Sequence, residues 1–234
     1  GARGQPRRRE GHRACRPGGL SVRASGPSPG PGETERSLGI RSTGIPGVAV
    51  SAVGPAPAAV LSAMEAALRE AFGLPVLRVA GIDEPPSAFS SPRGQWSSVA
   101  FLEALLARVP PGAARLLGVT ERDLFVPVLS FVYGQAQLGG KVAVVSLARL
   151  RPEFHGLPGA PPVLARRAAA EAVHEVGHTF GLVHCPDRRC PMSLSIDLPD
   201  LDGKTATPCP ACRVLLEGSR EMRRVRTPLE GDRP

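Results

Sequence analysis

Long apolar runs are missing from this chain of 234 residues. No stretch is long enough to cross a bilayer, and the N-terminal part lacks the uninterrupted apolar segment of a secretion signal. We therefore expect no membrane partner and a cytoplasmic location. The hydrophobic content of 42% still suffices for one good-sized core, so we expect a single folded domain with tails.

The middle of the chain has no excess of positive charge, although the formal net charge of the whole chain is +8. Residues 1–45 hold nine arginines against three glutamates, and residues 213–234 hold six arginines against four acidic residues. Residues 46–212 hold fourteen basic and fourteen acidic residues. Because the central part is neutral, nothing basic lines a groove that could follow phosphates, and we expect no nucleic-acid partner.

Large apolar residues are scarce in residues 1–45, which contain the run Arg7-Arg8-Arg9 and a segment rich in Gly, Pro and Ser at 25–32. This composition predicts a disordered basic extension. It could be a basic arm that touches RNA or an acidic surface. An unstructured extension or a misassigned start is the favoured alternative, since the sequence has no initiating Met.

Histidine is also scarce, yet three of the five histidines fall within residues 174–184. In a helix, His174 and His178 lie about one turn apart on one face, with Glu175 beside them. A continued helix would rotate His184 about 240° away from that face. Gly181 tolerates the left-handed conformation in which helices commonly end, so the chain can turn and bring His184 back.

Three neutral imidazoles leave the fourth position of a tetrahedral zinc ion open for water, as in catalytic sites. A bare H-E-x-x-H also occurs by chance in helices, where the histidines have ordinary packing or surface roles. The helix-ending Gly181 and the third histidine at the required spacing favour a zinc hydrolase.

Only five cysteines are present, and four of them form two closely spaced pairs. The pairs predict a closed tetrahedral zinc site that stabilises the fold. Thiolates on zinc suit a reducing compartment, whereas two disulfides in a secreted domain are the alternative. Cys15 is left over in the N-terminal segment. The four predicted ligands of the structural zinc are Cys185, Cys190, Cys209 and Cys212.

From about Gly47 to Leu216 the sequence resembles the archaemetzincins, whose signature is H-E-x-x-H-x-x-G-x-x-H-C, then C-x-M, then C-x-x-C. Other resembling segments are LLGVTERDLFVPVLSFVYGQA and KVAVVSLARL. The resemblance implies a metzincin-like fold in which Met192 lies in a tight turn beneath the catalytic zinc. The chain departs from the family pattern in having sixteen residues between Met192 and Cys209, one fewer than expected, and in Trp96, where we expect tyrosine.

Together these features predict an α/β fold, a compact metzincin-like single domain at 46–216 with a disordered extension at 1–45 and a tail at 217–234. A twisted mixed five-stranded sheet packs on two main helices, and the small Cys₄ zinc subsite follows the active-site helix. The expected strands are 48–53, 76–79, 115–119, 124–133 and 141–147, of which 124–133 is an edge strand because it contains Pro127. The expected helices are 58–72, 97–109, 163–180 and 213–226, with a loop at 83–96 and a turn at 202–203.

The predicted function is that of a zinc-dependent metallopeptidase, a monomer with two zinc ions per chain acting on a peptide or protein substrate. His174, His178 and His184 would hold the catalytic zinc, and Glu175 would accept a proton from zinc-bound water. Two alternatives remain: a non-catalytic zinc-stabilised module that binds a partner protein, and a zinc hydrolase of a non-peptide amide. A purely structural site would not need Glu175, but the non-peptide hydrolase would share every residue of the motif.

Overall fold

The computed structural model describes residues 47–219 and residue 222. The predicted extension at 1–45, with Cys15, lies outside these residues. Among the helices that are described, none is long and apolar enough to span a membrane.

The core of the fold is a five-stranded sheet, and the predicted mixed sheet is confirmed. Its order is β2-β1-β5-β8-β7; the first four strands run parallel, and β7 pairs antiparallel with β8. The strands are β1 (Val48–Ala52), β2 (Val76–Arg78), β5 (Arg115–Thr120), β7 (Gly134–Ala136) and β8 (Val142–Ser146). As predicted, β1 and β2 are joined through a helix, α1 (Ala58–Phe72), which ends at Gly73 in the left-handed conformation.

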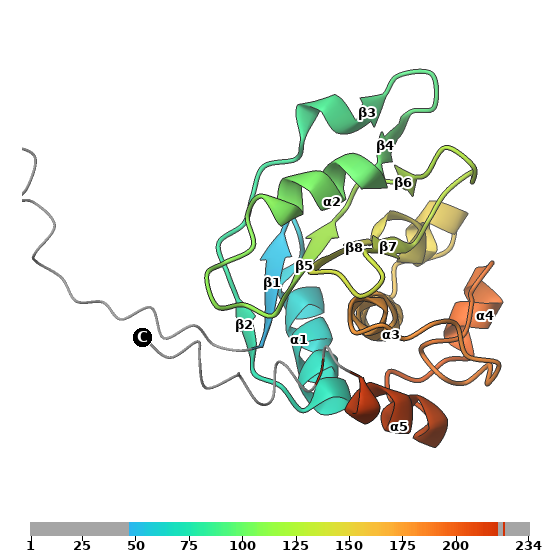
Figure 1. The fold of residues 1–234 in the computed structure, drawn as a ribbon. Helices are drawn as coiled ribbons and strands as arrows, with labels where there is room; N and C mark the ends of the chain where they lie inside the picture. Colours follow the sequence, from blue (N-terminus) through green and yellow to red (C-terminus); the bar gives the residue numbers. More distant parts are fainter. Residues whose placement is uncertain (1–46, 220–221, 223–234) are drawn as a thin grey trace, which may run out of the picture. The chain divides into compact units, whose positions relative to one another are not determined.

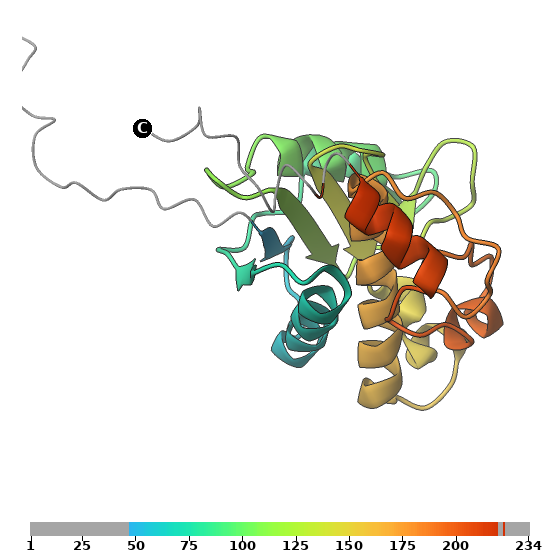
Figure 2. The same cartoon turned by 60° about the horizontal axis from the view of Figure 1, so that its bottom comes forward.

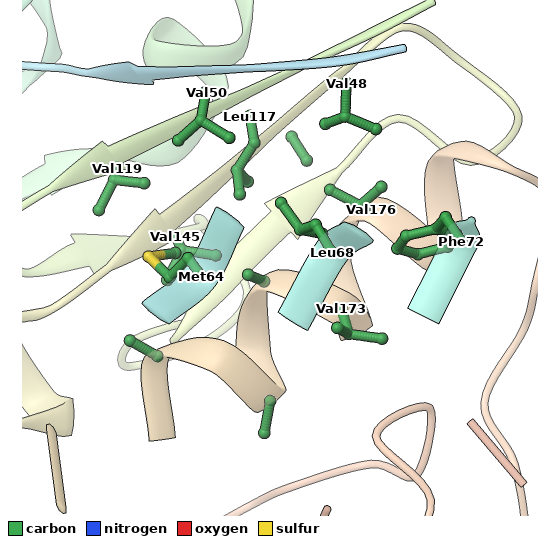
Figure 3. Packing of buried hydrophobic residues seen from close by; sticks show 14 of the residues in the cluster. Val48, Val50, Met64, Leu68, Phe72, Leu117, Val119, Val145, Val173 and Val176 are labelled. Carbon is green, nitrogen blue, oxygen red and sulfur yellow. The ribbon is translucent and has the colours of Figure 1, made fainter. Parts of the chain in front are cut away.

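Helices cover both faces of this sheet, as buried parallel strands require. Figure 1 shows α1 and α3 (Pro161–Thr179) on one face and α2 (Ser98–Leu106) on the other. Alternate residues of β1, β5 and β8 point into the two resulting cores. On the α1 and α3 face, Figure 3 shows the helix residues Met64, Leu68, Phe72, Val173 and Val176 packed against Val48, Val50, Leu117, Val119 and Val145.

The predicted strand at 124–133 is wrong beyond its first residues. Strand β6 (Leu124–Phe125) pairs with β4 (Gln95–Ser97) in a separate small sheet, and Pro127 lies in a turn. The chain then doubles back, because the N–H of Val132 donates to the carbonyl of Leu124 at 2.9 Å. Proline has no N–H for a ladder, so the edge strand of the main sheet begins only after it, at β7.

The predicted loop at 83–96 also contains regular structure: a short 3₁₀ helix (Pro86–Ala88) and strands β3 (Phe89–Ser90) and β4. Strand β3 pairs antiparallel with β4. Helix α2 begins at Ser98, within one residue of the predicted start, but ends at Leu106 rather than 109. Ser97 occupies the position before the helix, yet its side chain makes no capping hydrogen bond.

Two 3₁₀ turns, at Ala148–Leu150 and Pro152–His155, lie between β8 and α3. The part after α3 contains two short helices, α4 (Leu198–Asp202) and α5 (Pro210–Gly218). Both views, Figures 1 and 2, place α3 between α1 and the segment that contains α4. The turn predicted at 202–203 is thus the end of α4, and the helix predicted at 213–226 begins earlier, since Pro210 suits a first helical position. The predicted boundary at 216 falls inside α5, and Met222 is buried in the core.

Candidate active site

The end of helix α3 has the predicted reversal. Gly181 has a φ of 89°, in the left-handed region. The N–H of Leu182 donates to the carbonyl of Gly177 at 3.1 Å, and the N–H of Gly181 donates to the carbonyl of His178 at 2.9 Å. These two bonds form a Schellman motif, which satisfies the last helical carbonyls and turns the chain back toward the helix.

This turn brings together the three predicted imidazoles, whose nearest ring nitrogens all lie within 4.8 Å of one another. The Nε2 atoms of His174 and His178 are 3.1 Å apart. These two rings are each oriented by a backbone carbonyl on the other nitrogen: Nδ1 of His174 lies 2.8 Å from the oxygen of Pro191, and Nδ1 of His178 lies 2.7 Å from the oxygen of Leu182. The Nε2 atoms are therefore left to face a common point.

The protonation of these rings suits a metal. Burial lowers the pKa of His174 to about 3, and burial also lowers the pKa values of His178 and His184. At pH 7 the rings are neutral, the form in which imidazole binds a metal ion. The donor set therefore fits a zinc ion.

The imidazoles open into a cavity of about 560 Å³. Its floor is α3, one wall is the segment 129–136, and the other wall is the segment 194–196. Glu175 lies in this cavity next to the imidazoles. Apolar side chains make up much of both walls: Leu129, Phe131, Val132, Ala136, Leu194 and Ile196.

The carboxylate of Glu175 lies against the backbone of β7. A Cβ atom at Gly134 would be 2.6 Å from both Cγ and Oε1 of Glu175, so only glycine leaves room for it there. One helical turn earlier, Glu171 is buried in the same cavity and forms a hydrogen bond with Glu175. Burial raises the pKa of both carboxyl groups, and the charge of Glu171 raises that of Glu175 further.

A lysine completes this cluster of buried charges. Lys204 follows α4 and donates from Nζ to the carbonyl oxygens of Pro191 and Ser193. Burial lowers the pKa of Lys204, whereas attraction to the carboxylates of Glu171 and Glu175 opposes the effect. The cavity therefore contains a cation as well as two carboxyl groups.

Next to this site, the four predicted cysteines form a second group of possible ligands, with their Sγ atoms within 4.8 Å of one another. All four are free thiols. Burial raises the pKa of Cys190 and of Cys212, so four thiolates at this place require a cation that compensates their charge. The donor set again fits zinc, in a closed site.

The predicted methionine lies between the two groups. Met192 is fully buried in a turn that is closed by a hydrogen bond from the N–H of Ser193 to the carbonyl of Cys190. Its sulfur packs on helix α3, where a Cβ at Gly177 would lie 2.4 Å from Sδ. Its carbonyl accepts from the N–H of Cys185 at 2.9 Å.

The sequence analysis missed Glu171, Lys204 and Gly134. Glu171 could have been found, because it lies four residues before Glu175 and so shares its helix face. Lys204 and Gly134 reach the cavity only through the folding of distant segments, and no local pattern marks them.

Comparison with known proteins agrees with this geometry. The family model described as Peptidase family M54 matches residues 112–218. The archaemetzincin of Methanocaldococcus jannaschii is 41% identical over 165 residues, which cover 70% of this chain and 89% of the relative. The archaemetzincin of Methanopyrus kandleri is 44% identical over 133 residues, or 57% of this chain and 72% of the relative.

Solved structures give the same result. The crystal structure of the archaemetzincin from Methanopyrus kandleri matches with a TM-score of 0.65 and 36% identity, covering 76% of this chain and 95% of that one. A zinc-dependent peptidase from Methanocorpusculum labreanum matches with a TM-score of 0.68 and 30% identity, covering 73% of this chain and 100% of that one.

The fold and the H-E-x-x-H helix thus define the class of the metallopeptidases. The chain belongs to the archaemetzincin family. The predicted resemblance is confirmed, and the protein is a zinc metallopeptidase.

Proposed function

We propose that this peptidase hydrolyses peptide bonds with two zinc ions per chain, one catalytic and one structural. The catalytic ion is held by His174, His178 and His184. The structural ion is held by Cys185, Cys190, Cys209 and Cys212. The proposal is carried by one observation: three neutral imidazoles converge beside a buried carboxylate in a single cavity. A bound zinc ion supplies Lewis acidity there, which polarises a carbonyl and lowers the pKa of a water ligand to about 7.

Glu175 is the group that moves the proton. Its carboxylate accepts a proton from the attacking water and then donates that proton to the nitrogen of the leaving amine. Gly134 supports this role because it leaves room for the carboxylate at the backbone of β7. Met192, the methionine of the turn, packs against Gly177 on the helix that carries His174 and His178.

The substrate lies between the two walls of the cavity. The side-chain oxygens of Gln135 and Ser195, one on each wall, are buried without a hydrogen-bond partner among the described residues. Peptide N–H groups are donors that would satisfy them. We expect a monomer, and no nucleic-acid partner for residues 46–212, whose charges balance.

The test uses zinc-loaded protein with Glu175→Ala, His178→Ala and, as a matched control on an exposed helix surface, Glu103→Ala. Glu175→Ala should retain both zinc ions and the fold but lose about two to four powers of ten in the rate of peptide cleavage. His178→Ala should lose one zinc ion as well, and Glu103→Ala should resemble the parent.

Metal analysis and a peptide-library digest measure both properties. If the parent protein holds two zinc ions and cleaves nothing in a diverse library, peptide hydrolysis is wrong and a zinc-stabilised binding module takes its place. Full activity of Glu175→Ala would show that Glu175 is not the general base.

A further inference from the structure

Lys204 is a buried cation that the proposed reaction does not use. The chain contains only two lysines, Lys141 and Lys204. Lys141 is exposed, whereas only 5% of Lys204 is exposed, and Lys204 lines the cavity. Burying an ammonium group is unfavourable unless specific partners compensate its charge and its donors. These partners show what the residue does.

The hydrogen bonds of Lys204 lead directly to an imidazole. Nζ donates to the carbonyl oxygen of Pro191 at 3.2 Å and to that of Ser193. These carbonyls flank Met192, so the ammonium group clamps the turn on both sides. The oxygen of Pro191 also lies 2.8 Å from Nδ1 of His174. One carbonyl therefore joins Lys204 to a proposed zinc ligand.

The charge of Lys204 also concerns the cavity itself. Lys204 lines the same cavity as Glu171 and Glu175 of α3, so its positive charge faces a space that contains two buried carboxyl groups. A neutral side chain could also donate to carbonyls, but it could not compensate buried carboxylates. The need for an ammonium group therefore comes from the cavity and not only from the turn.

We propose that Lys204 is a positioning residue of the hydrolytic site: it fixes the carbonyl that orients His174, and it places a positive charge in the cavity that contains Glu175. The inference rests on the proposed function, in which His174 binds zinc and Glu175 transfers the proton. Removing an outer partner of a metal ligand typically costs about 10- to 100-fold in metal affinity or activity.

The experiment compares Lys204→Met, Lys204→Arg and the matched control Lys141→Met in the zinc-loaded full chain. Lys204→Met should lower the affinity for one of the zinc ions about 10- to 100-fold in a chelator competition. It should lower kcat more than it changes KM. Lys204→Arg, which keeps the charge, should recover part of both losses, and Lys141→Met should match the parent.

A spectroscopic measurement separates positioning from simple stabilisation. In the imidazole spectrum of ¹⁵N-histidine protein, the Nδ1–H signal of His174 should shift and exchange faster with water in Lys204→Met. An unchanged signal with unchanged zinc affinity and kcat would overturn the proposal. So would a Lys204→Arg variant that is no better than Lys204→Met in zinc affinity and kcat.

The parent protein provides a check that does not depend on whether the variants fold. With ¹⁵N-labelled lysine, the buried Nζ of Lys204 should give a slowly exchanging signal, whereas the exposed Lys141 should not. Absence of that signal would overturn the inference. The zinc-affinity and NMR measurements do not require turnover, so a failure of the parent to cleave peptides would count against the proposed function alone.

Discussion

At the scale of single residues, groups from three parts of the chain share the cavity with Glu175. Glu171 comes from the preceding helical turn, Gly134 from β7, and Lys204 from the segment after α4. The metal-facing residues His174 and His178 could be predicted, because helical spacing alone places them on one face. Gly134 and Lys204 could not, since their closeness to Glu175 depends on how distant segments pack.

The first prediction concerns Gly134→Ala. The added Cβ would lie 2.6 Å from Cγ and Oε1 of Glu175 and force the carboxylate to move. Because a catalytic group displaced by about 1 Å can cost about 10²-fold in rate, we expect kcat to fall about 10- to 100-fold with zinc content unchanged. Steady-state kinetics and metal analysis test this.

The matched control for this change is Gly218→Ala, because a Cβ there meets nothing within 4 Å. That variant should keep the parental kcat. A Gly134→Ala variant with parental kinetics would mean that Glu175 has more freedom than the packing indicates.

At the scale of elements, apolar runs and helical periodicity predicted β1, α1, α3 and β8 closely, because burial against the sheet reinforces those local patterns. The segment from 124 to 136 could not be predicted, because its apolar residues resemble one long strand. In the structure some of them line a cavity wall instead of joining a ladder. A site wall and a strand have the same composition, and only the tertiary structure distinguishes them.

The two apolar walls predict the substrate side chains. Leu129, Leu194 and Ile196 are 53%, 58% and 72% exposed at the cavity, so they can bury a large apolar side chain next to the scissile bond. For peptides with Leu or Phe next to the scissile bond, Leu194→Ser should lower kcat/KM about tenfold, since a missing apolar contact is worth about 1–3 kcal/mol. For peptides with Ser at that position, kcat/KM should hardly change.

The control for the wall variant is Leu215→Ser, which alters an exposed leucine of α5 that does not line the cavity. Parallel digests of matched peptides would show the preference. An equal loss for Leu, Phe and Ser peptides would contradict a role in selecting side chains.

Helix α4 depends on one ion-pair cluster. Asp202 accepts from Nε and Nη2 of the buried Arg167 at 2.8 and 2.7 Å, and also from Arg166. The hydrogen bond from Arg167 holds the pKa of Asp202 below its usual range. Stability from this group is therefore present above its unfolded-state pKa, about 3.9, and is lost as pH falls through the folded-state value.

Asp202→Asn should accordingly lower the free energy of unfolding at pH 7 by about 1–3 kcal/mol, because it removes the charge that Arg167 is bonded to. The deficit relative to the parent should shrink as the pH falls below about 4. Denaturant unfolding at several pH values measures it, with the exposed Asp83→Asn as the control. A deficit that persists at pH 2 would point to packing and not to charge.

At the scale of the whole molecule, the two proposed zinc sites are joined by a single peptide bond, between His184 and Cys185. They should nevertheless respond differently to metal removal. An open site exchanges its ion through the solvent-facing position, whereas a closed Cys₄ site must partly unfold. Mild chelator should stop hydrolysis and leave the thermal unfolding temperature nearly unchanged.

Cys209→Ser should instead lower that temperature and remove one zinc ion, because it breaks the closed site. It should also impair catalysis, since Cys185 helps to fix His184. Thermal unfolding followed by circular dichroism, with zinc analysis, separates these outcomes. A Cys209→Ser variant as stable as the parent would rule out a structural role for the cysteines.

The order of the elements along the chain has a consequence for synthesis. All five strands of the main sheet lie between residues 48 and 146, whereas every proposed zinc ligand lies between residues 174 and 212. A nascent chain therefore emerges from the ribosome with its scaffold first and its metal ligands last. The strands are synthesised before any of the proposed zinc ligands, so hydrolytic capacity arises only after the segment 174–212 has been made.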